Sequence, residues 1–327
     1  MEKVSIALCT FNGGKFISEQ LASFSDQTVL PDELVICDDG STDDTLAIIE
    51  SFASSAPFDV RVFRNPENLG STKNFEKAIG LCTGDIIFLS DQDDVWLPEK
   101  ISRMRKRFDE DPDLALLFSD AMLVDDDLNP LKRSLWEMVF PADRQAEFRD
   151  DPFKTLLWQN VVTGAAAAFR SRYREKFLPI PDAPGLIHDG WIALVLASVA
   201  KVDYLPEKLL LYRQHGSQQL GVGISDLDAG RDERLRRSLT YNRSEIGRLQ
   251  AMREIVNRFT NFPPQTIKLI DQNSIEREAM EMHYKARLGV SGDLFTRLGQ
   301  VAAEYRSGRY GRFSRGLGSA AKDLLGR

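Results

Sequence analysis

The sequence has few cysteines and histidines and no long hydrophobic run. Its 327 residues include three cysteines, Cys9, Cys37 and Cys82, an odd number without metal-type spacing. This pattern argues against a disulfide framework or a zinc cluster and favours buried, reduced thiols. No run of about 18 apolar residues is present, and no basic segment precedes an apolar stretch at the N-terminus. We therefore expect a cytoplasmic protein that is neither secreted nor membrane-spanning.

Glycine-rich phosphate loops are also missing. The first predicted strand is followed by Cys-Thr-Phe-Asn-Gly-Gly-Lys, where a dinucleotide-binding fold would carry Gly-x-Gly-x-x-Gly. No Gly-Lys-Ser/Thr loop follows any predicted strand. These absences disfavour NAD chemistry and P-loop nucleotide hydrolysis.

Charge is distributed unevenly along the chain. The net charge is −7, but residues 231–327 hold 19 Lys and Arg against 11 Asp and Glu, so this part is basic and the remainder strongly acidic. An acidic body argues against nucleic acid as the partner. A basic C-terminal part suits anionic lipid, a phosphate-bearing acceptor or the acidic body itself.

Hydrophobic periodicity predicts an α/β fold. Apolar runs of strand length alternate with helical patterns, which is typical of a Rossmann-like, mostly parallel sheet with flanking helices. The predicted strands are residues 3–9, 33–37, 59–63, 85–89 and 114–118. Helices are expected from around Gly14, from Ser41 or Thr42, and near Pro98.

The second half of the chain predicts fewer strands. Residues 120–153 favour a connecting segment with a short helix around Trp136, followed by a strand at 164–169, a helix at 189–200 and a strand at 208–212. From Leu227 onward the pattern is helical, with a break at Pro263 and Pro264. We therefore divide the chain into an α/β domain, residues 1–222, and a basic, α-helical C-terminal extension, residues 223–327.

Three carboxylates, Asp91, Asp93 and Asp94, directly follow a short apolar strand. Carboxylates this close repel one another, and burying them at a strand end is costly unless a cation or hydrogen-bond donors compensate. Hard oxygen ligands in this arrangement suit Mg²⁺ or Mn²⁺. The alternative is an acidic loop that caps the helix near Pro98.

Other polar side chains follow the remaining predicted strands. In open sheets of this class the ligand binds beyond the carboxyl ends of the strands. The residues at those ends are Thr10, Asn12, Asp38, Asp39, Asn68 and Gly70. A carboxylate at such a turn can accept hydrogen bonds from a nucleobase or ribose, while an ordinary helix-capping turn is the alternative. A phosphoacceptor receiver domain is disfavoured by the chain length and by the second acidic cluster.

Asp189 and two histidines have competing interpretations. Asp189 precedes an apolar helix, so it is either a helix cap or a general base. His215 ends a strand and could supply imidazole to a metal or a phosphate, or make a structural hydrogen bond. His283 lies on a charged helix, where we expect it to be solvated.

Four segments resemble family 2 glycosyltransferases of the GT-A fold. They read Ser-Ile-Ala-Leu-Cys-Thr-Phe-Asn-Gly at 5–13, Glu-Leu-Val-Ile-Cys-Asp-Asp-Gly-Ser-Thr-Asp at 33–43, Asn-Leu-Gly-Ser-Thr-Lys-Asn-Phe at 68–75 and Leu-Ser-Asp-Gln-Asp-Asp-Val-Trp at 89–96. The resemblance covers residues 3 to about 220. Glu-Gln-Leu at 19–21, His-Asp-Gly-Trp at 188–191 and Tyr-Arg-Gln-His-Gly at 212–216 are similar to a rhamnosyltransferase-like bacterial branch.

The resemblance implies an inverting transfer from a nucleoside-diphosphate sugar to a saccharide or lipid-linked acceptor in bacterial cell-surface polysaccharide synthesis, such as that of O-antigen. The implied donor is dTDP-rhamnose, with a UDP-hexose as the alternative. A catalytically silent member acting in polysaccharide assembly is a further alternative. Inversion requires in-line attack, with a base on the nucleophile and a cation on the departing diphosphate.

The same resemblance assigns roles to individual residues. Asp189 would be the base, and Asp93, Asp91 and His215 would form the site for Mg²⁺ or Mn²⁺. Asp91 would touch ribose or metal-bound water. The residues implied to bind the nucleotide sugar are Thr10, Asn12, Asp38 or Asp39, Asn68, Asp91 and Gln92.

Arginines and aromatic side chains interleave near the C-terminus. They are Arg297, Arg306, Arg309, Arg312 and Arg315 with Tyr305, Tyr310, Phe313 and Leu317. This pattern predicts peripheral contact with anionic lipid at the inner face of the plasma membrane, where a lipid-linked acceptor is presented. Packing against the acidic body and contact with a homodimer partner are the alternatives.

Overall fold

The computed structural model describes residues 2–182, 186–216, 230–258 and 265–325, except for the side chains of residues 255 and 258. These residues form two compact units, Met1–Pro181 with Ile187–Val222, and Asp182–Leu186 with Gly223–Arg327. The predicted positions of Leu227, Pro263 and Pro264 lie outside the described residues.

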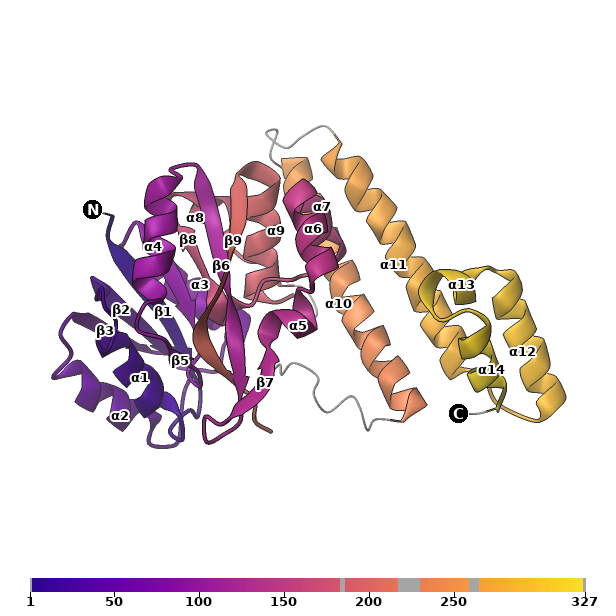
Figure 1. Cartoon of the computed structure of the whole chain (residues 1–327), viewed down its shortest axis with the longest axis horizontal. Coiled ribbons are helices and arrows are strands. Elements are labelled where there is room, and N and C mark those ends of the chain that lie inside the picture. The colour runs from indigo at the N-terminus through magenta and orange to yellow at the C-terminus, as the bar shows by residue number, and fades with distance from the viewer. Residues whose placement is uncertain (1, 183–185, 217–229, 259–264, 326–327) are drawn as a thin grey trace. The chain divides into compact units, whose positions relative to one another are not determined.

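The first unit is built on one mixed sheet (Figure 1). Its strands are β1 Val4–Thr10, β2 Glu33–Asp38, β3 Asp59–Arg64, β4 Ile86–Ser90, β5 Val95–Trp96, β6 Leu114–Val124, β7 Pro130–Ser134, β8 Ala167–Arg170 and β9 Lys201–Arg213. Their order is β3-β2-β1-β4-β8-β6-β9-β5, and β7 pairs with β6. The five strands predicted in the first half are confirmed as β1, β2, β3, β4 and β6.

Strand direction differs from the expected mostly parallel sheet. β3, β2, β1 and β4 are parallel, with Ala7 of β1 paired to Val35 on one side and to Leu89 on the other. β8 is antiparallel to both β4 and β6, although β6 and β9 are parallel. Periodicity predicts a strand but not its direction, which depends on how the chain returns to the sheet.

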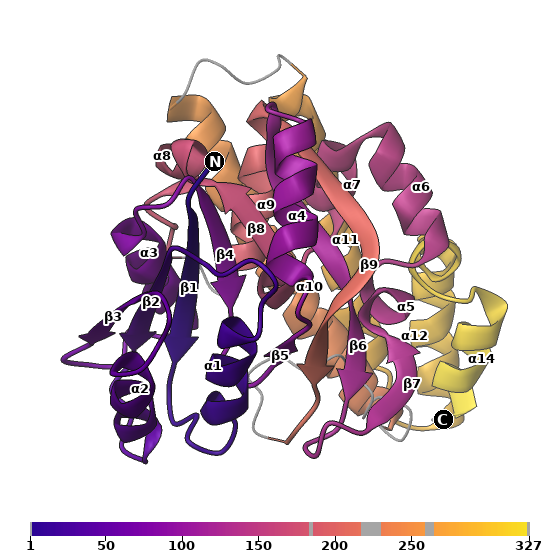
Figure 2. The ribbon, with the colours of Figure 1, turned by 60° about the vertical axis from the view of Figure 1, so that its left-hand side comes forward.

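Helices flank the sheet and bury its central strands. The helices of this unit are α1 Ile17–Ser25, α2 Thr45–Ala53, α3 Ser71–Leu81, α4 Lys100–Glu110, α5 Leu135–Val139, α6 Ala142–Asp150, α7 Pro152–Trp158, α8 Arg174–Phe177 and α9 His188–Val199. Figure 2 shows α4 lying across the sheet, where it packs on β6 and β9. Every residue of β1, β2 and β4 is buried, as their continuous apolar sequences predict for strands covered on both faces. Cys9, Cys37 and Cys82 are confirmed as buried free thiols.

The segment expected to be a connection, residues 120–153, is well packed. β6 continues to Val124, and the predicted short helix around Trp136 is found as α5. Phe118, Trp136, Phe140 and Tyr204 meet with ring centroids 5.2–6.1 Å apart, mostly edge to face. Aromatic packing therefore orders a segment whose own hydrophobic periodicity is weak.

The second unit is all helical, as predicted. Its helices are α10 Arg231–Arg258, α11 Thr266–Leu288, α12 Leu294–Arg306, α13 Arg309–Phe313 and α14 Leu317–Leu325 (Figure 1). α10 packs along α11, and the side-chain amide of Asn242 donates to the carbonyl of Arg277 at 2.8 Å. Within the described parts of the chain, no helix is both long and apolar enough to cross a membrane.

The expectation that His283 is solvated was wrong. Its side chain is buried, its Nδ1 lies 2.7 Å from Glu304 Oε1, and its ring packs edge-on against Tyr310. The reason is that α12 and α13 fold back over the face of α11 that carries His283. Tyr310 is also fully buried, and Arg309 pairs with Glu304. Two residues of the predicted lipid-contacting series therefore stabilise the unit internally.

Candidate active site

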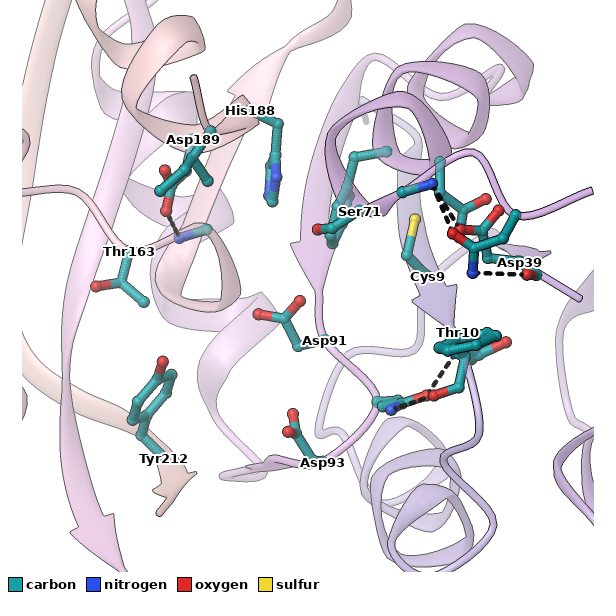
Figure 3. Close-up of a pocket in the computed structure, with 18 of the residues that line it drawn as sticks. Cys9, Thr10, Asp39, Ser71, Asp91, Asp93, Thr163, His188, Asp189 and Tyr212 are labelled. Carbon is teal, nitrogen blue, oxygen red and sulfur yellow. Dashed lines mark hydrogen bonds between the residues drawn. The ribbon is translucent and has the colours of Figure 1, made fainter. Parts of the chain in front are cut away.

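A polar cavity of about 450 Å³ lies at the carboxyl ends of β1, β2 and β4. Figure 3 shows Asp91 and Asp93 projecting into the space between Asp189 on one side and Thr10 with Asp39 on the other. These residues are distant in sequence but come together because parallel strands end at the same edge of the sheet. Of the predicted site residues, those that border the cavity are Thr10, Asp39, Asn68, Asp91, Gln92, Asp93, Asp189 and His215.

Asp38 and Asp39 have different positions. Asp38 does not border the cavity; its fully buried carboxylate accepts hydrogen bonds from the hydroxyls of Thr10 at 2.9 Å and Ser41 at 2.5 Å. Asp38 therefore fixes the β2–α2 turn, which corrects its candidate role as a nucleotide-binding residue. Asp39 reaches the cavity wall instead, and its carboxylate accepts from the backbone N–H groups of Leu69 at 2.8 Å and Gly70 at 2.9 Å.

Asn12 also lies outside the cavity lining. Its backbone has a φ of 49°, and its Oδ1 accepts a hydrogen bond from the backbone N–H of Thr42 at 2.9 Å. The side chain is thus occupied in joining the loops that follow β1 and β2. This corrects its predicted position in the nucleotide pocket, because Asn tolerates positive φ and serves as a turn residue here.

Gln92 and Asn68 border the cavity but also hold neighbouring loops. The amide of Gln92 accepts from the backbone N–H of Phe11 at 2.8 Å and donates to the carbonyl of Phe11 at 3.1 Å. A Cβ at Gly13 would lie 2.2 Å from Gln92 Oε1, so any larger residue there would displace this amide from Phe11. Asn68 donates to the carbonyl of Asp39 at 3.2 Å. Both amides therefore shape the cavity wall.

The acidic cluster is short of positive charge. Burial, followed by the charges of Asp93 and Asp189, raises the pKa of Asp91 to about 7. Burial and the charges of Asp93 and Asp91 raise the pKa of Asp94 well above its usual range. Asp94 Oδ1 accepts from the backbone N–H of Arg213 at 3.1 Å, whereas its buried Oδ2 has no hydrogen-bond partner among the described residues. Such a cluster is stabilised by an added cation.

Lys100 is a buried cation beside this cluster, and the sequence contained no motif that pointed to it. Its ammonium donates to the carbonyl of Ala165 at 2.5 Å and lies 3.8 Å from the ring centroid of Trp96. Burial lowers its pKa to about 7, although the charges of Asp94 and Asp91 oppose that shift. Lys100 thus connects the acidic cluster to the 3₁₀ turn Gly164–Ala166.

Asp93 is held from two directions. Its backbone carbonyl accepts from Nε of the almost fully buried Arg213 at 2.7 Å, and Arg213 also pairs with Glu19. Its carboxylate Oδ2 lies 2.8 Å from His215 Nε2. The guanidinium of Arg213 lies over the ring of Phe16, which also contacts the His215 ring at 4.7 Å between centroids. Asp93 and His215, both implied metal ligands, are therefore adjacent in the structure.

These residues fit a divalent cation only when a bound substrate supplies further ligands. No three His, Cys, Asp or Glu side chains in the described residues converge as a closed metal site. Asp93 and His215 offer an oxygen and a nitrogen ligand side by side, with Asp91 adjacent. Mg²⁺ commonly binds one or two carboxylates and completes its shell with water and substrate phosphates. The unpartnered Asp94 oxygen and the high pKa of Asp91 are consistent with a missing positive charge.

Asp189 is a half-buried carboxylate with a fixed orientation. It lies in the first turn of α9, where its Oδ2 accepts from the backbone N–H of Gly164 at 2.9 Å. Its Oδ1 accepts from Asn160 Nδ2 at 3.2 Å and from the backbone N–H of Gly190. Burial raises the pKa of Asp189 to about 6, even though these hydrogen bonds lower it. A carboxylate with such a pKa is ionised at neutral pH and can accept a proton.

Several aromatic residues of the cavity wall were not identified as site residues from the sequence. His188 stacks on Phe75 with ring centroids 3.8 Å apart, and burial lowers its pKa to about 3, so the imidazole is neutral. Phe11 and Tyr212 also border the cavity. All four lie in the segments that carry the family resemblance, but the sequence assigned no role in the site to any of them.

Comparisons with known proteins agree with this architecture. The family model described as glycosyl transferase family 2 matches residues 5–177. An uncharacterized glycosyltransferase of Nostoc is 27% identical over 225 residues, which cover 66% of this chain and 66% of that protein. An uncharacterized protein of Mycobacterium tuberculosis is 27% identical over 214 residues, which cover 65% of this chain and 59% of that protein. The chain thus spans less than two thirds of the length of these relatives.

Solved structures show the same fold. TarS of S. aureus, solved in complex with UDP-GlcNAc, has a TM-score of 0.58 at 17% identity, covering 99% of this chain and 88% of that chain. The mannosyltransferase PcManGT of Pyrobaculum calidifontis, in complex with GDP-Man and Mn²⁺, has a TM-score of 0.57 at 15% identity, covering 99% and 79%. At such identities the likeness concerns the fold alone, which is the predicted GT-A fold with its helical C-terminal region.

Proposed function

The chain belongs to glycosyltransferase family 2, and from this premise we propose that it transfers a sugar, with inversion, from a nucleoside-diphosphate sugar to a saccharide or lipid-linked acceptor. One observation carries the proposal. A half-buried, ionisable carboxylate, Asp189, faces the Asp91 and Asp93 carboxylates across one polar cavity. A base on one side and an anion-binding cation site on the other are what a single displacement requires.

On the donor side, Asp93 and His215 would hold Mg²⁺ or Mn²⁺, and the adjacent Asp91 would bind ribose or metal-bound water. When bound, the cation neutralises the charge that develops on the departing diphosphate. The pairing of Asp93 with His215 and the anchoring of Asp93 by Arg213 support this arrangement. The Mn²⁺ in the related mannosyltransferase structure supports the choice of a divalent ion.

On the acceptor side, Asp189 takes the proton from the attacking hydroxyl while the oxygen bonds to the anomeric carbon. The bond from that carbon to the diphosphate oxygen breaks in the same displacement, so no covalent enzyme intermediate is formed. The backbone N–H of Gly164 and the amide of Asn160 fix the carboxylate in place. Both are donors, so they stabilise the ionised form that acts as the base.

The nucleotide contacts that we propose involve Asp39, Asn68 and Thr10, which border the cavity. Asp39 replaces Asp38 in this role because only the former reaches the cavity wall. The UDP-GlcNAc and GDP-Man in the related structures support a nucleotide sugar as the donor class. For the donor itself we propose dTDP-rhamnose, on the motifs similar to the rhamnosyltransferase-like branch, and a UDP-hexose is the competing choice.

We place the reaction in bacterial cell-surface polysaccharide synthesis at the cytoplasmic face of the membrane. The helical unit supports a peripheral contact because α12 exposes apolar side chains next to arginines. Phe295 is 83% exposed and Leu298 is 44% exposed, while Arg297 and Arg306 lie on the same helix. Co-sedimentation with anionic vesicles should fall when Phe295 and Leu298 are both changed to Ser; unchanged binding would remove α12 from the contact.

A donor screen tests the proposed function. Binding and slow hydrolysis of dTDP-rhamnose, UDP-glucose and UDP-galactose are measured with Mn²⁺, with Mg²⁺ and with a chelator. We expect metal-dependent selection of one donor that is lost in Asp93→Ala and kept in the matched control Asp150→Asn, which alters an exposed acid on α6. If no donor binds under any condition, the chain is a catalytically silent member acting in polysaccharide assembly.

A further inference from the structure

The helical unit contains its own cavity, of about 590 Å³, and its lining is strongly basic. Residues from α10, α11, α13 and α14 and from the turn before α14 form the wall. The charged members are Arg231, Arg234, Arg287, Arg315 and Lys322, and no described residue of the lining is acidic. Ser238 and Tyr284 add hydroxyl groups to the same wall. The proposed glycosyl transfer uses none of these residues.

Two of the arginines are held in place from behind. Asp323, which is almost fully buried, accepts from Arg231 Nε at 2.8 Å and from Arg287 Nε at 2.7 Å. Tyr310 also donates its hydroxyl to Asp323, at 2.6 Å. One carboxylate thus orients two guanidinium groups, which reduces the entropy lost when they bind a ligand. It balances only one of their two charges.

Two further cations of the wall, Arg315 and Lys322, have side chains without a partner among the described residues. The guanidinium of Arg315 and the ammonium of Lys322 make no hydrogen bond or ion pair with any described residue. Asp232 is the other acid that pairs with Arg231, and it lies at an exposed position on α10. Arg315 and Lys322 are exposed, so an external anion can reach them together with the two arginines that Asp323 orients.

We propose that this cavity binds a phosphoryl group, as a phosphate monoester or a diphosphate. Guanidinium groups match phosphate oxygens with two parallel N–H donors, and lysine adds a point charge. The volume exceeds that of a single phosphate and lies within the usual range for small-ligand pockets. The group could arrive on a soluble molecule or on a lipid headgroup. Only the lipid-linked source rests on the proposed function; the phosphoryl chemistry rests on the cavity itself.

Binding measurements on the full chain test this proposal. Pyrophosphate and inorganic phosphate are titrated calorimetrically with a chelator present, which suppresses metal-dependent binding at the Asp93 site. Vesicles of phosphatidylcholine containing phosphatidic acid are compared with vesicles containing phosphatidylserine at matched surface charge. The test variant is Arg315→Ala with Lys322→Ala. The control, Arg236→Ala with Lys268→Ala, removes one exposed arginine and one exposed lysine of the same unit outside the cavity.

We expect the test variant to weaken binding of pyrophosphate or of phosphatidic acid vesicles by about tenfold for each lost contact. The control should change the same affinity less than about twofold, because long-range charge is screened. Binding of pyrophosphate indicates a soluble source, and binding of phosphatidic acid vesicles alone indicates a headgroup. No binding of any probe by the unaltered chain, or an equal loss in the control, would overturn the proposal. Neither result bears on the donor screen.

Discussion

Replacing Asp189 by Asn removes the proposed base while keeping the size of the side chain. General-base catalysis contributes about 10²–10⁴-fold, so we expect kcat to fall by that factor. Donor binding should be nearly unchanged because the proposed metal ligands, Asp93 and His215, keep their own contacts. The measurement is kcat and KM for the selected donor in the unaltered chain and in the variant.

The pH dependence of the unaltered enzyme follows from the same carboxylate. Burial raises the pKa of Asp189 to about 6. The ionised form is the active base, so the rate should rise with pH through about 6 and level off above about 7. At pH 5 about one tenth of the carboxylate is ionised, which predicts a rate about tenfold below the plateau. The residual activity of Asp189→Asn should not show this rise with pH, the acid limb of the profile.

A structural explanation for the loss must be excluded separately. In the variant, an amide nitrogen would face groups that now donate hydrogen bonds to the carboxylate, such as Gly190 N–H and Asn160 Nδ2. We expect this mismatch to cost about 1–3 kcal/mol in the free energy of unfolding, measured by urea denaturation. Activity above about one tenth of the original, or an unchanged acid limb in Asp189→Asn, would refute the assignment of Asp189 as the base.

Three further predictions concern neighbouring residues. Lys100→Met should lower the free energy of unfolding, measured by urea denaturation, by about 3 kcal/mol, because it leaves buried carboxylates uncompensated. The control Lys106→Met, at an exposed position of the same helix, should change that free energy by less than about 0.5 kcal/mol. Gly164→Ala should lower kcat by about 10–100-fold and leave donor affinity unchanged. The added Cβ would lie 2.9 Å from His188 Nε2 and displace the turn that orients Asp189. A kcat within twofold of the original would contradict this prediction. His215→Ala should weaken Mn²⁺ affinity, measured by calorimetry in the presence of nucleoside diphosphate, by about tenfold or more. The control His283→Ala removes a buried partner of Glu304, so it should lower thermal stability and leave Mn²⁺ affinity unchanged.

The sequence predicted which polar residues lie together because the pattern that it used, polar residues directly after apolar strands, is local. Polar residues follow apolar strands, and parallel strands bring their carboxyl ends to one edge, so Thr10, Asp39 and Asp91 were expected near one another and lie around one cavity. The choice between Asp38 and Asp39 could not be made in the same way. Successive side chains at a strand end point to opposite sides, and the motif alone does not say which side faces the cavity.

Features that depend on tertiary packing were not predictable. Lys100 reads as an ordinary polar residue at a helix start, and only its burial beside Asp94 reveals it as an internal cation. His283 lies among charged residues, and its burial follows from α12 and α13 folding over α11. The direction of β8 likewise depends on how the chain returns after α7, which hydrophobic periodicity does not encode.

The measurement that tests the central claim most directly is a proton NMR time course of the selected nucleotide sugar with the full chain. The buffer contains Mg²⁺ and no Mn²⁺. Early spectra report release of the nucleoside diphosphate together with the anomeric configuration of the sugar product. The proposed single displacement predicts a product of inverted configuration, formed with Mg²⁺ and absent with a chelator or in Asp93→Ala. A product that retains the donor configuration, or turnover that is equal with chelator, would contradict metal-dependent inversion with Asp189 as the base.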